Sequence, residues 1–376
     1  MRKILVSTLL CTAFGLPALQ AQDATPKYVN EFLNIGVGAR ALGMSLSQVS
    51  SVNDVTAGYW NPAGLVGIQS DLELAAMHSE YFAGIAKYDY AAIGKSIDST
   101  SSASFSFIRF GVDDIPNTID LYDPSGNINY DRITTFSSAD YAFIFSYARK
   151  GLPWKKGVSN SGNWTGLSWG LNAKVIYRQV GDFANSWGFG FDGGIKGNYD
   201  KWKFGLVARD VTSTFNAWTF SLDERTQQVF QQTNNELPQN GLEIALPRLI
   251  AGVGREFNWK KVSLLAELNA TFTTDGRRNT LVSANPVSID PNMGIELGYA
   301  KTIYFRMGVG NIQKAKNFDD SKYYTLQPNL GIGLRIRQLY LDYALSDIGN
   351  VSDVLYSNVF SLKYQINKSP NRVKPN

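Results

Sequence analysis

The chain has 376 residues, a formal net charge of +4, one cysteine and one histidine. So small a net charge gives no support for nucleic acid or a strongly acidic partner, and a single cysteine excludes a disulfide framework or a thiolate metal site. Aromatic residues make up 13% of the chain; with 34 glycines and no sustained helical periodicity, they argue against two soluble domains.

The first 21 residues are typical of a secretory signal peptide. A basic start is followed by an apolar run over residues 4–16 and by small residues that predict cleavage after Ala21. The run is too short to span a bilayer as a mature helix. A lipoprotein signal at Cys11 is the alternative, but Leu10 before it is not a small residue. We therefore expect an exported protein.

Residues 22–69 form a separate segment, because they lack the alternation that follows them. Such a segment either folds in the periplasm or enters a barrel as a plug. Residues 70–366 are interpreted below as fourteen strands, which enclose a lumen wider than side chains alone can fill. We therefore expect residues 22–69 to form an N-terminal plug (hatch) inside the lumen. Gly36, Gly38 and Gly43 do not have the G-x-G-x-x-G spacing of a dinucleotide loop.

Four plug residues are candidate site residues: Arg40, Asn61, Pro62 and Ala63. A charge inside a plug needs an opposite charge, so we expect Arg40 to retain the plug by pairing with a lumen carboxylate. The candidate partners are Asp192, Glu267, Glu296 and Asp342. Asn61-Pro62-Ala63 either gates a lumen pathway or forms a turn that anchors the plug, since proline fixes φ and asparagine favours turns. We favour the anchor.

Residues 70–366 repeat a pattern of period two, which is typical of β-strands. Over 167–178, for example, Trp169, Leu171 and Val175 alternate with the polar residues Asn172 and Lys174. Fourteen such segments lie near 70–79, 88–96, 102–111, 139–148, 167–178, 186–197, 201–210, 248–257, 262–272, 292–300, 303–310, 326–336, 338–345 and 357–366. The charged face of each strand avoids lipid only if it lines an enclosed lumen. The unpaired backbone groups of an open sheet edge would have no water to bind in hydrocarbon, so the strands are expected to close into a barrel.

The predicted fold class is therefore all-β: a 14-stranded antiparallel transmembrane β-barrel in the outer membrane of a Gram-negative bacterium. Residues 367–376 are expected to form a short periplasmic tail. Short and long connections alternate, and the long ones, near 112–138, 211–247, 273–291, 311–325 and 346–356, are expected outside the cell. The connections at 149–166 and 179–185 are exceptions to the alternation.

The long loops hold the candidate protein-binding residues, since loops on a rigid scaffold often carry binding sites. These residues are Asp113, Asp114 and Ile115 in the 112–138 loop and Phe215, Trp218, Phe220 and Phe230 in the 211–247 loop. Large apolar side chains in a loop mark a protein-binding surface if they are exposed. The alternative is that they fold over the mouth of the barrel.

Nothing in the chain predicts an enzyme. His78 precedes Ser79, and neighbouring residues on a strand point to opposite faces, so they cannot form a nucleophile and base pair. We expect no catalytic residue, no cofactor and no metal ligand.

The string Asn61-Pro62-Ala63-Gly64-Leu65 ahead of fourteen strands resembles the FadL superfamily of outer-membrane barrels. The wider string from Ile35 to Met44, which leads to Tyr59 and Trp60, and the string from Phe110 to Thr118 resemble the PorV/PorQ family of Bacteroidetes more closely. The resemblance covers the whole architecture, but its motifs cover only about 32–65 and 110–118. PorV itself is expected to have a Pro-Asp-Ala-Arg-Ala-Gly type of string at the position where this chain has Val37-Gly38-Ala39-Arg40-Ala41-Leu42. The difference indicates a paralogue rather than PorV proper.

The PorV/PorQ resemblance implies work beside the type IX secretion system, whose PorV-like barrels bind the C-terminal signal domains of cargo. We therefore predict a non-enzymatic accessory protein of a secretion or surface-assembly machine, which binds partner or cargo proteins through its extracellular loops and rim. The alternative is a FadL-like transporter for a hydrophobic small molecule, with a lipid or detergent-like ligand in the lumen. It requires a dry, apolar pocket between plug and loops, and the polar lumen faces expected from the sequence weaken it.

Overall fold

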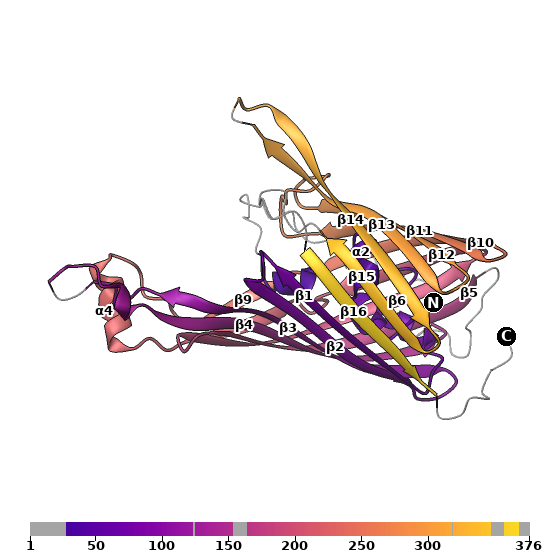
Figure 1. The fold of residues 1–376 in the computed structure, drawn as a ribbon, viewed down its shortest axis with the longest axis horizontal. Coiled ribbons are helices and arrows are strands. Elements are labelled where there is room, and N and C mark those ends of the chain that lie inside the picture. Colours follow the sequence, from indigo (N-terminus) through magenta and orange to yellow (C-terminus); the bar gives the residue numbers. More distant parts are fainter. Residues whose placement is uncertain (1–27, 123–124, 153–163, 318, 347–356, 368–376) are drawn as a thin grey trace, which may run out of the picture.

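The computed structural model describes residues 28–122, 125–152, 164–317, 319–346 and 357–367. Within them the strands form one antiparallel sheet that closes on itself, because β1 (Leu72–Tyr81) pairs with both β2 (Ala86–Ser96) and β16 (Ser357–Ile366), while β5 (Trp164–Val180) pairs with β6 (Ala184–Tyr199). The wall surrounds a lumen (Figure 1). The predicted signal peptide and residues 368–376 of the predicted tail lie outside the described residues.

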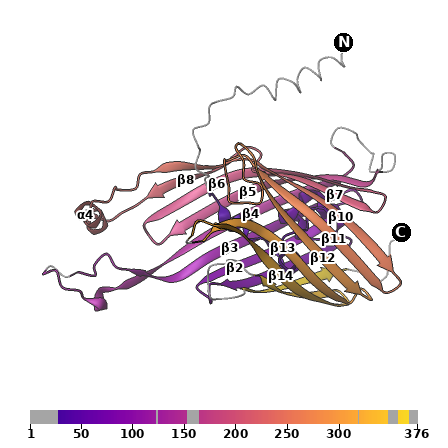
Figure 2. The same ribbon diagram turned by 90° about the horizontal axis from the view of Figure 1, so that it is seen from above.

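The remaining strands complete the wall in chain order. They are β3 (Ser101–Asn117), β4 (Thr134–Lys150), β7 (Trp202–Arg209), β8 (Thr214–Phe220), β9 (Gly241–Ala245), β10 (Arg248–Trp259), β11 (Val262–Thr273), β12 (Ser288–Tyr299), β13 (Ile303–Lys316), β14 (Lys322–Ile336) and β15 (Leu339–Ser346). Short helices are η1 (Glu31–Asn34), α2 (Ala39–Gly43), α3 (Ala57–Trp60), η2 (Pro62–Gly67) and η3 (Tyr130–Arg132). A longer one, α4 (Glu224–Gln232), lies beyond the barrel (Figure 2). No helix among the described residues is long and apolar enough to cross a membrane.

Fourteen strand positions make the wall, as predicted, because two of the positions are each shared by two strands. β6 pairs with β7 through Gly193–Tyr199 and with β8 through Ala184–Phe189, so β8 continues the line of β7. In the same way β9 pairs with β8, and β10 pairs with β7. The breaks fall at residues 210–213, where Asp210 and Ser213 have positive φ, and at 246–247, where Pro247 cannot donate a ladder hydrogen bond.

The prediction that 211–247 is a single loop is therefore wrong. Phe215, Trp218 and Phe220 belong to β8, and only Phe230, on α4, lies between the strands. The 112–138 loop is likewise shorter than predicted, because β3 continues past a bulge between Val112 and Ile115 and pairs with β4 again. Asp113, Asp114 and Ile115 are consequently strand residues.

The two ends of the barrel differ in their connections. One end, called here the turn end, carries short connections at 97–100, 200–201, 260–261, 300–302 and 337–338. The opposite end, the loop end, carries the long extensions of β3–β4 and β13–β14 together with α4 (Figure 1). In outer-membrane barrels short turns face the periplasm and long loops the exterior, so the turn end is the periplasmic end.

The alternation of side chains places charged residues on the lumen side of the wall, as predicted. On β5, Leu171 is 55% exposed on the outside, whereas Lys174 is buried on the inside. The Lys174 ammonium lies 2.7 Å from the Asp192 carboxylate and 2.6 Å from that of Asp210. Asp210 also accepts hydrogen bonds from Thr214 and Arg248. This ion cluster fills the inner side of the wall at the break between β7 and β8.

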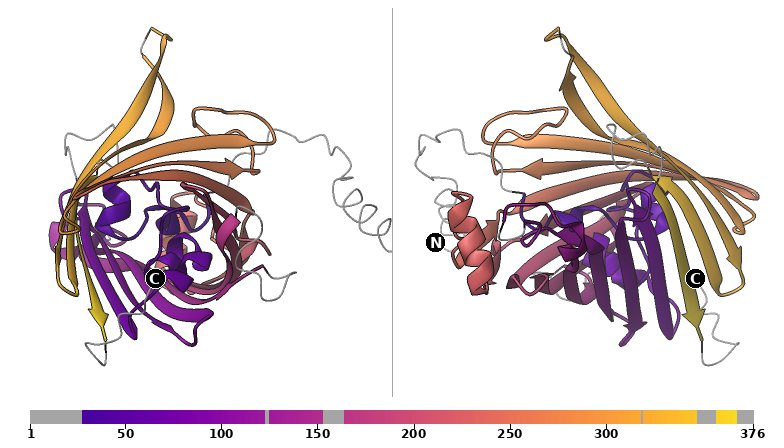
Figure 3. Two further views of the ribbon diagram at one scale, coloured as in Figure 1. Left: turned by 90° about the vertical axis from the view of Figure 1, so that its right-hand side faces the viewer. Right: turned by 60° about the vertical axis from the view of Figure 1, so that its left-hand side comes forward.

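The segment 28–69 lies inside the barrel, as Figure 3 shows in the view along its axis. Its helices touch the wall on several sides: α2 packs against β13, β14, β15 and β16, and η2 packs against β3, β4, β5 and β6. Between them, the carbonyl of Val49 lies over Gly205, on β7. The described part of the predicted plug therefore spans the lumen.

We predict that Lys174→Met destabilises the folded barrel by about 3 to 5 kcal/mol, because it removes the cation that two buried carboxylates share and leaves Asp210 paired with the more distant Arg248. Thermal denaturation in detergent, followed by the migration shift of the folded barrel on gels, measures this. Lys95→Met, at an exposed lysine on the outer wall, is the matched control. Equal melting temperatures for the two variants would contradict the role given to the cluster.

Candidate functional site

The plug is anchored to β5 and β6 by Asn61, Pro62 and Ala63. The Asn61 side chain accepts a hydrogen bond from the Ala63 amide and donates to the carbonyl of Ile195 on β6. A Cβ added to Gly194 would lie 2.3 Å from the Asn61 amide oxygen, so this close approach requires glycine. These contacts tie the Asn61 turn to the wall, and its role as an anchor rather than a gate stays a prediction.

An ionic latch holds the opposite side of the plug. The Arg40 guanidinium lies 2.8 Å from Glu296, one of the four carboxylates expected as its partner. Glu296 is also 2.7 Å from Arg306, which in turn lies 2.6 Å from Asp342. One plug cation thus enters a wall network of two carboxylates and one arginine. Of the other two candidate partners, Glu267 accepts a hydrogen bond from the plug amide of Ser50, and Asp192 pairs with Lys174.

A second ionic contact involves Asp54 in the plug and Lys363 on β16. Their carboxylate and ammonium groups are 2.5 Å apart, and the Thr56 hydroxyl also donates to Asp54. Burial alone would raise the pKa of Asp54, but the charge of Lys363 and these hydrogen bonds outweigh it and lower the pKa to about 2. Asp54 therefore stays ionised at ordinary pH.

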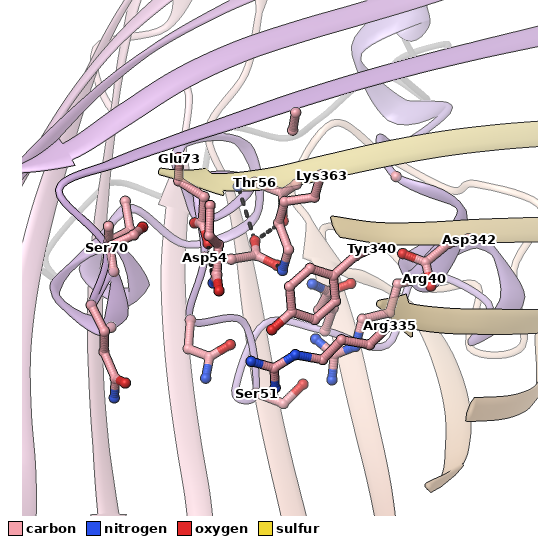
Figure 4. A pocket seen from close by; sticks show the side chains of 18 of the residues that line it. Arg40, Ser51, Asp54, Thr56, Ser70, Glu73, Arg335, Tyr340, Asp342 and Lys363 are labelled. Carbon is pink, nitrogen blue, oxygen red and sulfur yellow. Dashed lines mark hydrogen bonds and ion pairs between the residues drawn. The ribbon is translucent and has the colours of Figure 1, made fainter. Parts of the chain in front are cut away.

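A cavity of about 1340 Å³ separates this ionic side of the plug from the turn end. Arg40, Asp54 and Lys363 line its inner part, and turn residues such as Lys261 and Lys301 line its mouth. Figure 4 shows Asp54 beside Lys363 and Glu73, with Tyr340 and Arg335 nearby. Charged and hydroxyl groups dominate the lining, so the cavity is a hydrated vestibule open to the periplasmic side.

The other side of the plug makes an apolar seal in the loop half of the barrel. Plug residues Val37, Leu42 and Tyr59 belong to one buried cluster with inward residues of β1 to β5. The larger of these wall residues are Met77, Tyr81, Tyr88, Tyr90, Ile108, Ile144 and Ile176; the cluster also includes Ala344 on β15 and Val359 on β16. Aromatic and aliphatic side chains therefore dominate the inner face of β1 and β2, whereas buried serines on β3 and β4 and Asn172 and Lys174 on β5 keep the polar lumen face expected from the sequence.

Tyr88 is the centre of the aromatic part of this seal. Its ring centroid lies 6.2 Å from that of Phe110 and 6.4 Å from that of Tyr81. The side chain is fully buried, and its hydroxyl has no hydrogen-bond partner among the described residues. A buried hydroxyl without a partner is costly, which makes this position a candidate contact for a ligand that has both apolar surface and a polar group.

The predicted loop residues do not form one surface. Asp113 pairs with Lys87 at 3.2 Å on the outer side of the wall, while Ile115 is opposite Phe136 in the ladder. Phe215 packs against Phe189 on the outside, and Trp218 stacks on Phe220. The strands β4, β5 and β6 separate the two groups.

His78 and Ser79 point to opposite faces, as alternation requires. The Ser79 hydroxyl is buried and donates to the carbonyl of Asn358, while His78 lies on the outer face 2.7 Å from Asp89.

No known family profile and no curated protein sequence matches the chain. Solved structures share its fold. The monoaromatic hydrocarbon channel CymD is 13% identical with a TM-score of 0.52, and the match covers 89% of this chain and 98% of that one. The Pseudomonas putida toluene transporter TodX is 12% identical with a TM-score of 0.51, covering 89% and 99%. The Ralstonia pickettii toluene transporter TbuX is 12% identical with a TM-score of 0.50, covering 88% and 99%.

The chain is thus similar to FadL-type outer-membrane barrels, which confirms the predicted fold and indicates an outer-membrane protein. The prediction of an accessory protein for secretion is contradicted, because the solved structures that share the fold are small-molecule transporters. The comparisons give no support for the PorV/PorQ family, a Bacteroidetes origin or type IX secretion. The sequence interpretation failed because it relied on two short motifs and on aromatic side chains assigned to a loop.

We predict that Glu296→Gln loosens the plug, because it removes the charge that Arg40 and Arg306 share. Loss of a charge-assisted hydrogen bond worth about 1.5 kcal/mol shifts an equilibrium about tenfold, so the open fraction in planar-bilayer recordings should rise about tenfold. Glu256→Gln is the matched control, because Glu256 pairs with Lys203 and both belong to the wall. Identical recordings for the two variants would show that the latch does not hold the plug.

The Asp54 contact also predicts a pH dependence. A carboxyl whose pKa falls from 3.8 to about 2 in the folded state stabilises that state fully above 3.8 and loses this effect as pH falls through about 2. The contribution of Asp54 to plug opening, taken as the difference between the unaltered protein and Asp54→Asn in bilayer recordings, should therefore be constant between pH 7 and pH 4 and should fall away between pH 4 and pH 2. An acid response of Asp54→Asn identical to that of the unaltered protein would assign the acid dependence to another group.

Proposed function

We propose that the chain is an outer-membrane channel for small hydrophobic molecules. The observation that carries the proposal is the two-sided plug: an apolar seal against β1 to β5 towards the outside and a hydrated vestibule towards the periplasm. The seal provides the apolar contact region that this function requires and that the polar alternation alone had made doubtful. The shared fold with CymD, TodX and TbuX supports the same interpretation.

A ligand that enters from outside the cell would meet the apolar seal first and the hydrated vestibule second. This order suits a hydrophobic molecule that moves from the membrane surface into the water of the periplasm. An apolar molecule is favoured next to Tyr81, Tyr88 and Ile108, which belong to the apolar cluster and do not line the vestibule. The charged lining of the vestibule gives it no comparable contact, so release towards the periplasm follows once the plug moves aside. A permanently open aqueous pore does not fit, because the plug spans the lumen and its residues are largely buried.

The primary test is uptake of radiolabelled toluene by cells that make the protein, compared with cells that carry an empty vector. We expect faster uptake of toluene and no change in the uptake of a sugar of similar size, because the seal is apolar. Equal toluene uptake in the two strains would contradict the proposed function. Faster uptake of the sugar would indicate a general pore instead.

A disulfide lock tests whether the plug moves. A Cβ built at Gly58 on α3 lies 2.9 Å from the Ser146 hydroxyl oxygen on β4, which suits a disulfide between Gly58→Cys and Ser146→Cys. The only native cysteine is Cys11. We expect the oxidised double variant to lose toluene uptake and the reduced form to recover it, with each single variant active under both conditions. Full uptake in the oxidised form would place the path elsewhere than through the plug.

A further inference from the structure

The hairpin of β13 and β14 leaves the wall at the loop end. Pairing of β12 with β13 ends at Met293 and Val309, and pairing of β14 with β15 ends at Asn329 and Ser346. Beyond a bulge after Gly310, β13 and β14 pair only with each other among the described residues. Figure 3 shows this hairpin projecting outwards from the barrel rather than along its axis, so it extends over the surrounding membrane.

One face of this hairpin continues the lipid-facing surface of the wall. On β14 the outward residues are Ile336, Leu334, Ile332, Leu330, Leu326, Tyr324 and Lys322, all exposed. The ladder places Lys314 opposite Tyr324 and Lys316 opposite Lys322, so all three lysines share this face. The outward surface thus changes from aliphatic to tyrosine and then to lysine along one strand.

The position of this change matches the edge of the hydrocarbon. A tilted strand crosses the membrane core in about 9 to 11 residues. Counted from Ile336 at the turn end, that span ends near Leu326, and Tyr324 then lies at the interface, where tyrosine is favoured. Lys314, Lys316 and Lys322 consequently lie at the level of the lipid headgroups.

The lysines line a cup of about 290 Å³ together with residues of the 274–287 connection. The other lining residues are Asn279, Thr280, Leu281 and Ser283, so the described lining contains no carboxylate. The connection is held against the hairpin by the Lys314 amide, which donates to the Asn279 side chain at 3.0 Å. Asp320, in the exposed turn and outside this lining, lies 3.5 Å from Lys316.

We propose that this cup binds the phosphorylated headgroup of a lipid in the outer leaflet. Three ammonium groups with amide and hydroxyl neighbours suit a phosphate, which carries charge and several acceptor oxygens. The outward direction and the membrane depth favour a lipid over a free anion, because the acyl chains of such a lipid can lie along Leu326 and Leu330 below the cup. This site is separate from the lumen, so it does not depend on what the channel carries.

Native mass spectrometry of the intact barrel in detergent tests the proposal, with diphosphorylated lipid A as the probe. Each lysine near an anionic headgroup contributes about fivefold to affinity. The triple variant Lys314→Gln, Lys316→Gln and Lys322→Gln should therefore bind the lipid about a hundredfold more weakly. The same lipid after phosphatase treatment should bind the unaltered protein about as weakly.

The matched control is Lys95→Gln, Arg149→Gln and Lys201→Gln, which removes the same charge from exposed positions outside the cup. It should bind lipid A as the unaltered protein does. Gel migration before and after heating establishes that both variants are folded. Equal lipid affinity of the two triple variants would overturn the proposal, and so would full displacement of lipid A by an equal concentration of inorganic phosphate, which would indicate a site for a free anion.

Discussion

The fold depends on one constraint: a backbone polar group in hydrocarbon has no water to bind, so every strand in the wall needs two neighbours. The pairing of β1 with β16 meets this requirement by closing the sheet. Closure at fourteen strand positions then creates a lumen too wide to be filled by wall side chains. The N-terminal segment fills it, and the charges that avoid lipid by pointing inwards gain partners from that segment and from each other.

The plug meets the wall in two chemically different ways. Against β1 to β5 it packs by apolar contact, so moving it away exposes hydrophobic surface unless an apolar ligand covers that surface. Against β12 to β16 it is held by ion pairs next to a hydrated vestibule, where water can solvate Arg40 and Glu296 once they separate. A ligand that occupies the apolar side therefore shifts the balance towards an open plug, because it covers the hydrophobic surface that opening would expose.

The sequence predicted the wall well because the alternation is a direct consequence of lipid on one side and charge on the other. Lys174 and Leu171 needed no tertiary information to be assigned to opposite faces. The strands β8 and β9 were missed because Asp210 and Pro247 interrupt the pattern where the wall is broken.

The apolar seal was missed for a related reason. Tyr81 and Tyr88 face inwards on β1 and β2, whose alternation is the least regular, and an inward aromatic residue cannot be told from an outward one until the register is known. Four carboxylates could be named from the sequence as possible partners of Arg40. The choice of Glu296 among them depends on the position of the plug in the lumen, which the sequence does not define.

The same constraint explains where the wall can be irregular. Among the described residues, the β13–β14 hairpin loses both lateral neighbours only after its strands have crossed about the thickness of the core. The break at 210–213 also lies towards the loop end of its strand position, and there the Asp210 amide donates to the side chain of Asp192 on β6 rather than to a backbone carbonyl. At this break a side-chain carboxylate thus replaces a ladder acceptor. Residues freed from pairing in this outer zone are available for binding, and on the β13–β14 hairpin they include Lys314, Lys316 and Lys322.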